Sequence, residues 1–172
     1  MRVVDKPEAL RLLETWKRGL RDASCLPCAL LREAEPNAHV IAAHEHGVVL
    51  LNQFAQRRGH LMVVSRRHVE HAHELGWNAY SELQHLAYDA ALALQRVLTP
   101  ARVFSAVLGS SAALATSYPH LHIHVCPVFE TDERARPARV FSWSEGVVVY
   151  EEHEARALAQ SLREAFSSNA LP

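Results

Sequence analysis

Three histidines alternate with apolar residues between His120 and Val125, where the sequence is His-Leu-His-Ile-His-Val. Side chains alternate between the two faces of a β-strand, so His120, His122 and His124 are expected to share one face. Imidazole titrates near neutrality and can act as a nucleophile, a proton donor or acceptor, or a metal ligand. Three of them in a row therefore indicate proton-transfer, nucleophilic or metal-ligating chemistry.

A second group of reactive side chains lies near the N-terminus, where Cys25 and Cys28 are separated by two residues. This spacing is typical of metal sites, although a redox pair or two buried thiols are alternatives. The third cysteine, Cys126, has no partner in the sequence, and we interpret it as a small packing residue. Three cysteines are too few for a disulfide framework, and their number is odd.

Hydrophobic patterns on both sides of these residues predict the elements that position them. Helical spacing predicts helices over 7–22, 77–98 and 151–166. Apolar runs bounded by turn residues predict strands over 40–43, 48–51, 61–64, 102–108, 121–128 and 146–150. We expect an α+β fold, in which an antiparallel sheet of about five strands has helices on one side.

Other segments are expected to be irregular. The stretch from Cys25 to Cys28 is predicted to be a proline-bearing turn, and 130–139 a charged loop. The small residues of 109–117 form a loop that can approach a ligand closely. Histidines outside these patterns are expected at the surface: His39, His44, His46, His85 and His153. Tryptophans are assigned to the core or an interface rather than to base stacking: Trp16, Trp77 and Trp143.

Composition limits the class of protein. The chain has 172 residues, of which 49% are hydrophobic, so it can close one hydrophobic core. Its net charge is −1, with acidic and basic residues interspersed, which argues against a nucleic-acid-binding protein. Since no segment approaches about 20 consecutive apolar residues and the N-terminus is unlike a signal peptide, we expect a cytoplasmic protein without membrane contacts.

The histidine row and the residues upstream of it resemble the histidine triad (HIT) superfamily. The row continues through Cys126 to Pro127, and the upstream matches are 50–54, 59–64 and 66–71, in the expected order. The resemblance covers about 20–130. It implies a single HIT-like domain over 1–172, with an N-terminal helix and a C-terminal strand and helix added to its core.

The resemblance implies a nucleotide hydrolase or nucleotidyl transferase. By similarity, His122 attacks the α-phosphorus and forms a covalent nucleotidyl-histidine intermediate, while His124 supports the phosphate oxygens and His60 completes the polar set. Three residues are expected to bind substrate, Asn52 at the ribose and two in the loop before the triad: Asn52, Ser117 and Gly109. The loop departs from the family pattern, so a non-catalytic nucleotide-binding or scaffolding domain is the alternative. A second metal site at the histidine row is a third interpretation.

Some histidine triad relatives, including the galactose-1-phosphate uridylyltransferase branch, bind zinc through a similar Cys-x-x-Cys pair and two histidines. Mapped onto this chain, the resemblance implies a closed, structural zinc site with four ligands: Cys25, Cys28, His68 and His120. His71 or His73 could replace His68, because the spacing allows it. The resemblance also implies a homodimer that joins two sheets.

Overall fold

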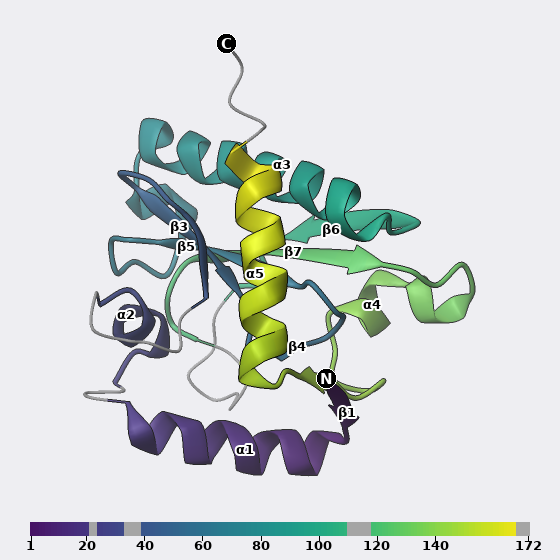
Figure 1. Cartoon of the computed structure of the whole chain (residues 1–172). Helices are drawn as coiled ribbons and strands as arrows, with labels where there is room; N and C mark the ends of the chain where they lie inside the picture. Colours follow the sequence, from purple (N-terminus) through teal and green to yellow (C-terminus); the bar gives the residue numbers. More distant parts are fainter. Residues whose placement is uncertain (21–23, 33–38, 110–117, 168–172) are drawn as a thin grey trace.

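The computed structural model describes residues 1–20, 24–32, 39–109 and 118–167 (Figure 1). Its strands are β1 (Arg2–Val4), β2 (Val40–Ala43), β3 (Gly47–Leu51), β4 (Phe54–Ala55), β5 (Leu61–Ser65), β6 (Arg102–Ala106), β7 (His122–Val128) and β8 (Val147–Val149). Its helices are α1 (Lys6–Gly19), α2 (Leu26–Leu30), α3 (Trp77–Leu98), α4 (Pro137–Val140) and α5 (Glu152–Ser167), with short 3₁₀ turns η1 (Ala72–Glu74) and η2 (Glu133–Ala135). The fold is α+β, as predicted.

An antiparallel sheet of five strands forms the centre of the molecule, in the order β2-β3-β5-β7-β6. Its inner strands β3, β5 and β7 are buried along their whole length. In the β5–β7 register, Met62 lies opposite His124 and Val64 opposite His122. Since a slip of one residue would turn every side chain to the other face, this register fixes which face carries the histidines.

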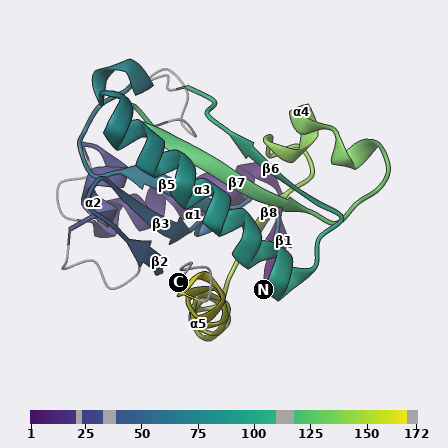
Figure 2. The ribbon, with the colours of Figure 1, turned by 90° about the horizontal axis from the view of Figure 1, so that it is seen from above.

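The apolar face of the sheet is covered by α3 and α5. Leu83, Leu86 and Leu94 of α3 are buried in one cluster with Val63 of β5 and Ile123 of β7. Viewed from above, α3 runs across the sheet, with α5 lying beside it at the β2 edge (Figure 2). The helix α3 ends at Leu98. Its C-cap, Thr99, has a left-handed φ of 46° and is followed by Pro100, a residue that cannot continue a helix.

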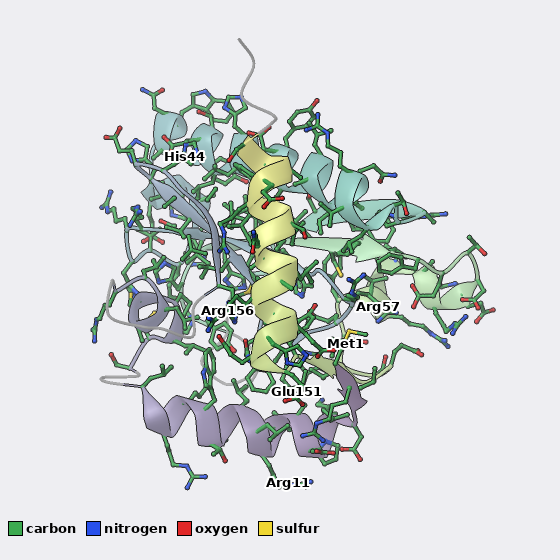
Figure 3. The ribbon with its side chains drawn as sticks, in the orientation of Figure 1. Met1, Arg11, His44, Arg57, Glu151 and Arg156 are labelled. Carbon is green, nitrogen blue, oxygen red and sulfur yellow. The ribbon has the colours of Figure 1, made fainter. Side chains whose placement is uncertain are left out.

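The opposite face also has helices, so the expectation of helices on one side was too simple. Asp5 caps α1 by accepting the Glu8 N–H at 2.8 Å, and Leu13 of this helix is buried in a cluster with Val48 and Met62. The helix α1 lies on the opposite side of the sheet from α3 (Figures 1 and 2). Arg11 points away from the body of the molecule, on the outer side of α1 (Figure 3).

Several short elements were not predicted. A second sheet has the order β1-β8-β4. Its strand β8 lies within the predicted strand 146–150, whereas β1 and β4 have three and two residues, too few to show a period in the sequence. The expected turn at Cys25–Cys28 leads instead into α2, whose first turn contains Pro27, a position where proline is tolerated. Within the expected charged loop, the structure has η2 and the beginning of α4.

One histidine expected at the surface is buried. His39 is 8% exposed, and its Nε2 lies 3.5 Å from Glu152 Oε2. The packing of α5 against β2 covers it, which a lone histidine in the sequence could not reveal. By contrast, His44, His85 and His153 are exposed, as expected. No helix in the described ranges has the length and apolar character needed to cross a membrane.

We predict that α3 packs so closely on β3 that Gly47 cannot carry a side chain. A Cβ at this position would collide with Leu83 Cδ2 and lie 2.8 Å from Leu86 Cδ1, and both leucines are buried. Gly47→Ala should therefore lower the free energy of unfolding by about 1–3 kcal/mol, measured by urea denaturation. Gly19→Ala is the control, because a Cβ there meets nothing within 4 Å. Equal stability of the two variants would contradict the close packing.

Candidate functional site

The strand register brings the polar residues of three strands together on the face opposite α3. Asn52 follows β3 and His60 precedes β5, and the Asn52 N–H donates to the His60 carbonyl at 2.9 Å. Because Met62 lies opposite His124, His60 is the diagonal neighbour of His124 across the β5–β7 pair. His122 lies two residues before His124 on the same face of β7. The fold therefore assembles residues that are up to 72 positions apart in the sequence.

Three buried imidazoles form a continuous hydrogen-bonded series, which we call the histidine chain (His60, His124 and His122). His60 Nε2 lies 3.0 Å from His124 Nδ1, and His124 Nε2 lies 3.1 Å from His122 Nε2. The Nδ1 of His122 lies 2.7 Å from the backbone carbonyl oxygen of His120. A carbonyl can only accept, so Nδ1 of His122 carries the hydrogen, and its Nε2 presents a lone pair.

Burial keeps the histidine chain uncharged. It lowers the pKa of His124 to about 3, with repulsion from His122 as a smaller cause. The pKa of His60 lies well below its usual value, first because of burial and then because of His124 and His122. Burial also lowers the pKa of His122, against the opposing effect of its hydrogen bond to the His120 carbonyl. All three imidazoles are therefore neutral at pH 7.

The four residues expected to hold zinc lie together, and we call them the Cys-His cluster (Cys25, Cys28, His68 and His120). Their ligand atoms all lie within 4.8 Å of one another. Cys25 Sγ is 3.3 Å from His120 Nδ1, and Cys28 Sγ is 3.3 Å from His68 Nδ1. Zinc–sulfur and zinc–nitrogen bonds of normal length in a tetrahedron separate such atoms by about 3.5 Å. The cluster thus fits a closed tetrahedral zinc site.

The orientation of His120 supports this fit. Its Nε2–H donates to the Ser65 carbonyl at 2.7 Å, which leaves the lone pair of Nδ1 directed at the two thiols. The lone pair of His120 Nδ1 and the nearby Nδ1 of His68, both beside thiols, favour a metal over a redox pair. His71 and His73 stack on each other at 5.5 Å between ring centroids and do not join the cluster, so the proposed replacement of His68 is not supported.

An apolar pocket opens beside the histidine chain. It is lined by residues from α1, α2, β3, β4, β5 and the segment before β7, chiefly Trp16, Leu26, Leu30, Leu50, Phe54, Met62 and Tyr118, with Asn52 and Gln53 as polar members. The rings of Trp16 and Phe54 lie 5.7 Å apart, and the Tyr118 ring lies 6.2 Å from that of His122. Sequence spacing gave no signal for this pocket, because its residues come from separate segments; Trp16 had been assigned to the core or an interface.

The segment between β7 and β8 covers the His124 end of the histidine row. The Phe141 ring lies 5.9 Å from that of His124, and Cys126 is buried in a small apolar cluster, as expected for a packing residue. Arg57 Nε lies 2.9 Å from Glu130 Oε1, and this largely buried ion pair joins the turn before β5 to the segment. Sequence reasoning did not identify Phe141 or Arg57, since neither belongs to a recognisable motif.

Of the three residues expected to bind substrate, the structure places Asn52 at the site. Asn52 lines the apolar pocket and contacts His60, with Nδ2 and Nδ1 3.0 Å apart. Gly109 is exposed beyond the end of β6, with a φ of 75°. Ser117 lies outside the described residues, as does the rest of the loop from 110. The roles of Gly109 and Ser117 therefore stay predictions.

Comparisons with known proteins agree with this geometry. A family model of the HIT domain matches residues 33–131, more than half of the chain. An uncharacterized 16.1 kDa HIT-like protein of Mycoplasma pneumoniae is 26% identical over 115 residues, which cover 67% of this chain and 78% of that protein. An uncharacterized HIT-like protein of Mycoplasma genitalium is 25% identical over 109 residues, covering 63% and 76%.

Solved structures share the fold. A hypothetical histidine triad nucleotide-binding protein of Sulfolobus tokodaii has a TM-score of 0.65 and 20% identity, covering 84% of this chain and 93% of that one. A zinc-bound histidine triad family protein of Mycobacterium smegmatis has a TM-score of 0.64 and 20% identity, covering 85% and 95%. A diadenosine triphosphate hydrolase of Plasmodium falciparum has a TM-score of 0.61 and 12% identity, covering 81% and 82%.

The match to the family model and the fold both agree with the row of alternating histidines at His120, His122 and His124. The chain therefore belongs to the HIT (histidine triad) family.

Proposed function

We propose that the protein is a nucleotide hydrolase or nucleotidyl transferase in which His122 is the nucleophile. Its substrate is a nucleoside phosphate, a dinucleoside polyphosphate or a nucleotide conjugate. The observation that carries the proposal is the 2.7 Å bond from His122 Nδ1–H to the His120 carbonyl. This bond fixes the tautomer, so that the other nitrogen, Nε2, keeps its lone pair at neutral pH without a separate base. In the free protein this lone pair accepts the His124 Nε2–H, so the substrate displaces that hydrogen bond.

In the first step, His122 Nε2 attacks the α-phosphorus and a P–N bond forms. The bond from phosphorus to the leaving group breaks, and the electron pair departs with the leaving oxygen or nitrogen. The imidazole becomes positively charged, which the Nδ1–H bond to the His120 carbonyl stabilises. The Nε2–H of His124, 3.1 Å from the nucleophilic nitrogen, is placed to donate to a phosphate oxygen. Water or another acceptor then attacks the phosphorus, the P–N bond breaks with its electron pair returning to His122 Nε2, and the proton of the acceptor passes to the solvent.

The lining of the apolar pocket suits the nucleoside of this substrate, which would move these closely spaced side chains apart on entering. Its walls are flat aromatic rings and aliphatic side chains, which bind a heteroaromatic base by stacking and burial. The Tyr118 ring connects the pocket to His122, and burial raises the pKa of the Tyr118 phenol to about 12, so it stays protonated. The base would lie at Trp16 and Phe54, with the phosphates directed toward His122 and His124.

Zinc at the Cys-His cluster would be structural, because two thiolates and two imidazoles fill a tetrahedral shell and leave no position for substrate. When bound, it would hold α2 against the beginning of the triad segment. His120 would then serve both sites, since its ring faces the cluster while its carbonyl holds His122.

We also propose that residues 1–172 form one HIT-like domain that assembles as a homodimer. Residues outside the matched range share apolar clusters with the sheet: Leu13 of α1 packs with Met62, and Leu162 of α5 with Val63. The dimer is supported by β6, the edge strand beside β7, near which Val107 and Leu108 are 44% and 51% exposed. A second copy pairing at this edge would join two sheets.

Replacing the nucleophile should remove turnover but not binding. We expect His122→Asn to lower kcat by about 10³-fold or more on the best substrate from a panel of adenosine and guanosine phosphates, dinucleoside polyphosphates and phosphoramidates. The dissociation constant of the nucleotide, measured by calorimetry, should change only a few-fold. His85→Asn on the exposed side of α3 is the control. Undiminished turnover of His122→Asn would refute the mechanism, whereas nucleotide binding without any product from the wild type would support the non-catalytic alternative.

The buried neutral histidines should make stability depend on pH. In the unfolded chain His124 takes up a proton below about pH 6.5, whereas in the folded state it stays neutral down to about 3. Its contribution to stability is therefore present above pH 6.5 and falls as the pH drops, by up to about 1.4 kcal/mol per pH unit. Urea denaturation from pH 7 to 5 should show a shallower dependence for His124→Gln than for the wild type. His85→Gln should match the wild type, and parallel curves for all three proteins would disprove the assignment.

Zinc should be bound at about one ion per chain, measured by elemental analysis of protein produced with zinc in the medium. Cys28→Ser should lose most of the metal, because a hydroxyl is a poor replacement for a thiolate ligand. Its free energy of unfolding should fall by about 4 kcal/mol if the free zinc concentration is 1,000 times the dissociation constant. His71→Gln, outside the Cys-His cluster, should retain the zinc. A zinc-free wild type would rule the metal site out.

A further inference from the structure

The side-chain amide of Asn52 is engaged at both ends inside the protein. Its Oδ1 accepts the Phe54 N–H at 3.1 Å, and its Nδ2 lies 3.0 Å from His60 Nδ1. A backbone N–H can only donate, so the oxygen of the amide must be the end that faces Phe54. The NH₂ group consequently faces His60.

This orientation determines which nitrogen of His60 carries its hydrogen. The NH₂ group can only donate, so His60 Nδ1 must accept, and in a neutral imidazole the hydrogen is then on Nε2. The His60 side chain is fully buried, which disfavours a second proton. Asn52 thus selects one of the two tautomers of His60.

The tautomer of His60 in turn determines the tautomer of His124, its neighbour in the histidine chain. His60 Nε2–H donates to His124 Nδ1, so the hydrogen of His124 is on Nε2, from where it donates to His122 Nε2. At the other end, the His120 carbonyl independently requires the hydrogen of His122 on Nδ1 and a lone pair on Nε2. Two backbone groups at opposite ends, the Phe54 N–H and the His120 carbonyl, therefore impose the same set of tautomers.

We propose that Asn52 is a positioning residue that sets the tautomers of His60 and His124 and so keeps the His124 Nε2–H directed at the phosphate position beside His122. It acts through His60, without contacting the reacting atoms. The proposal rests on the proposed function of His122 as nucleophile. It gives Asn52 a role separate from the ribose contact expected from the family resemblance.

The conservative variant Asn52→Asp tests the proposal, because a carboxylate accepts at both oxygens and cannot donate. His60 Nδ1 must then carry a hydrogen, through a change of tautomer or through an added proton. We expect ¹⁵N spectra of histidine-labelled, full-length protein to show His60 Nδ1 unprotonated in the wild type and protonated in Asn52→Asp. A His60→Gln variant assigns the signal. Asn78→Asp, the same chemical change at an exposed position of α3, should leave the spectrum unchanged.

Kinetics separate this role from ribose binding. We expect Asn52→Asp and the apolar Asn52→Leu to lower kcat by about 10²-fold or more. In the Ser-His-Asp triad of serine proteases, a wrong tautomer of the histidine lowers kcat by about 10⁴-fold. KM should change less than about threefold, and the ratio of kcat/KM between ribonucleotide and 2′-deoxyribonucleotide substrates should stay near that of the wild type. If Asn52 contacted only the ribose, its variants would instead raise KM and bring the ratio of kcat/KM between ribonucleotide and 2′-deoxyribonucleotide substrates close to one.

A protonated His60 Nδ1 in the wild type would overturn the proposal, whether or not any variant folds. An unchanged kcat in both Asn52 variants would overturn it as well. Failure of the proposed function gives a different result, since His122→Asn would then keep its turnover while the nitrogen spectra still report the tautomers set by Asn52.

Discussion

The structure depends on burying three imidazoles without charge. An imidazolium in this site would be costly, so each ring stays neutral and has one donor and one acceptor to satisfy. The histidine chain meets this constraint because each N–H faces a lone pair, from Asn52 to the His120 carbonyl. In such a chain every hydrogen bond donates in the same direction, from Asn52 toward the His120 carbonyl. The same constraint that allows burial therefore leaves a lone pair on His122 and a donor on His124, which is the arrangement that attack on phosphorus needs.

The antiparallel register is what makes this chain possible. Asn52 and His60 come from the ends of β3 and β5, and His124 lies diagonally across from His60 on β7. The opposite face of the same strands packs against α3, where Gly47 allows a close approach. Since moving one strand by one residue would exchange its two faces, the apolar core and the histidine chain specify the same register.

His120 connects the two sites. Its ring belongs to the Cys-His cluster, where the Ser65 carbonyl orients it, and its backbone carbonyl holds His122. A bound metal would stiffen the strand where the proposed nucleophile needs a fixed orientation, so its effect on chemistry would be indirect. Around this centre, α1 supplies Trp16 to the apolar pocket, and the segment after β7 supplies Phe141 beside His124. Trp16 and Phe141 both lie outside the residues that the family model matches.

The sequence alone determined the long elements, because α3 has a clear helical spacing and the strands of the large sheet are apolar runs bounded by turn residues. It also determined that His122 and His124 share a face, since alternation along a strand is a local property. The tertiary structure decided what local pattern cannot encode. Strand pairing brought Asn52 and His60 to the row, helix packing buried His39, and three separate segments met at Cys25, His68 and His120. The direction of each hydrogen bond emerged only there, because it depends on which backbone donor or acceptor lies at each end of the chain of side chains.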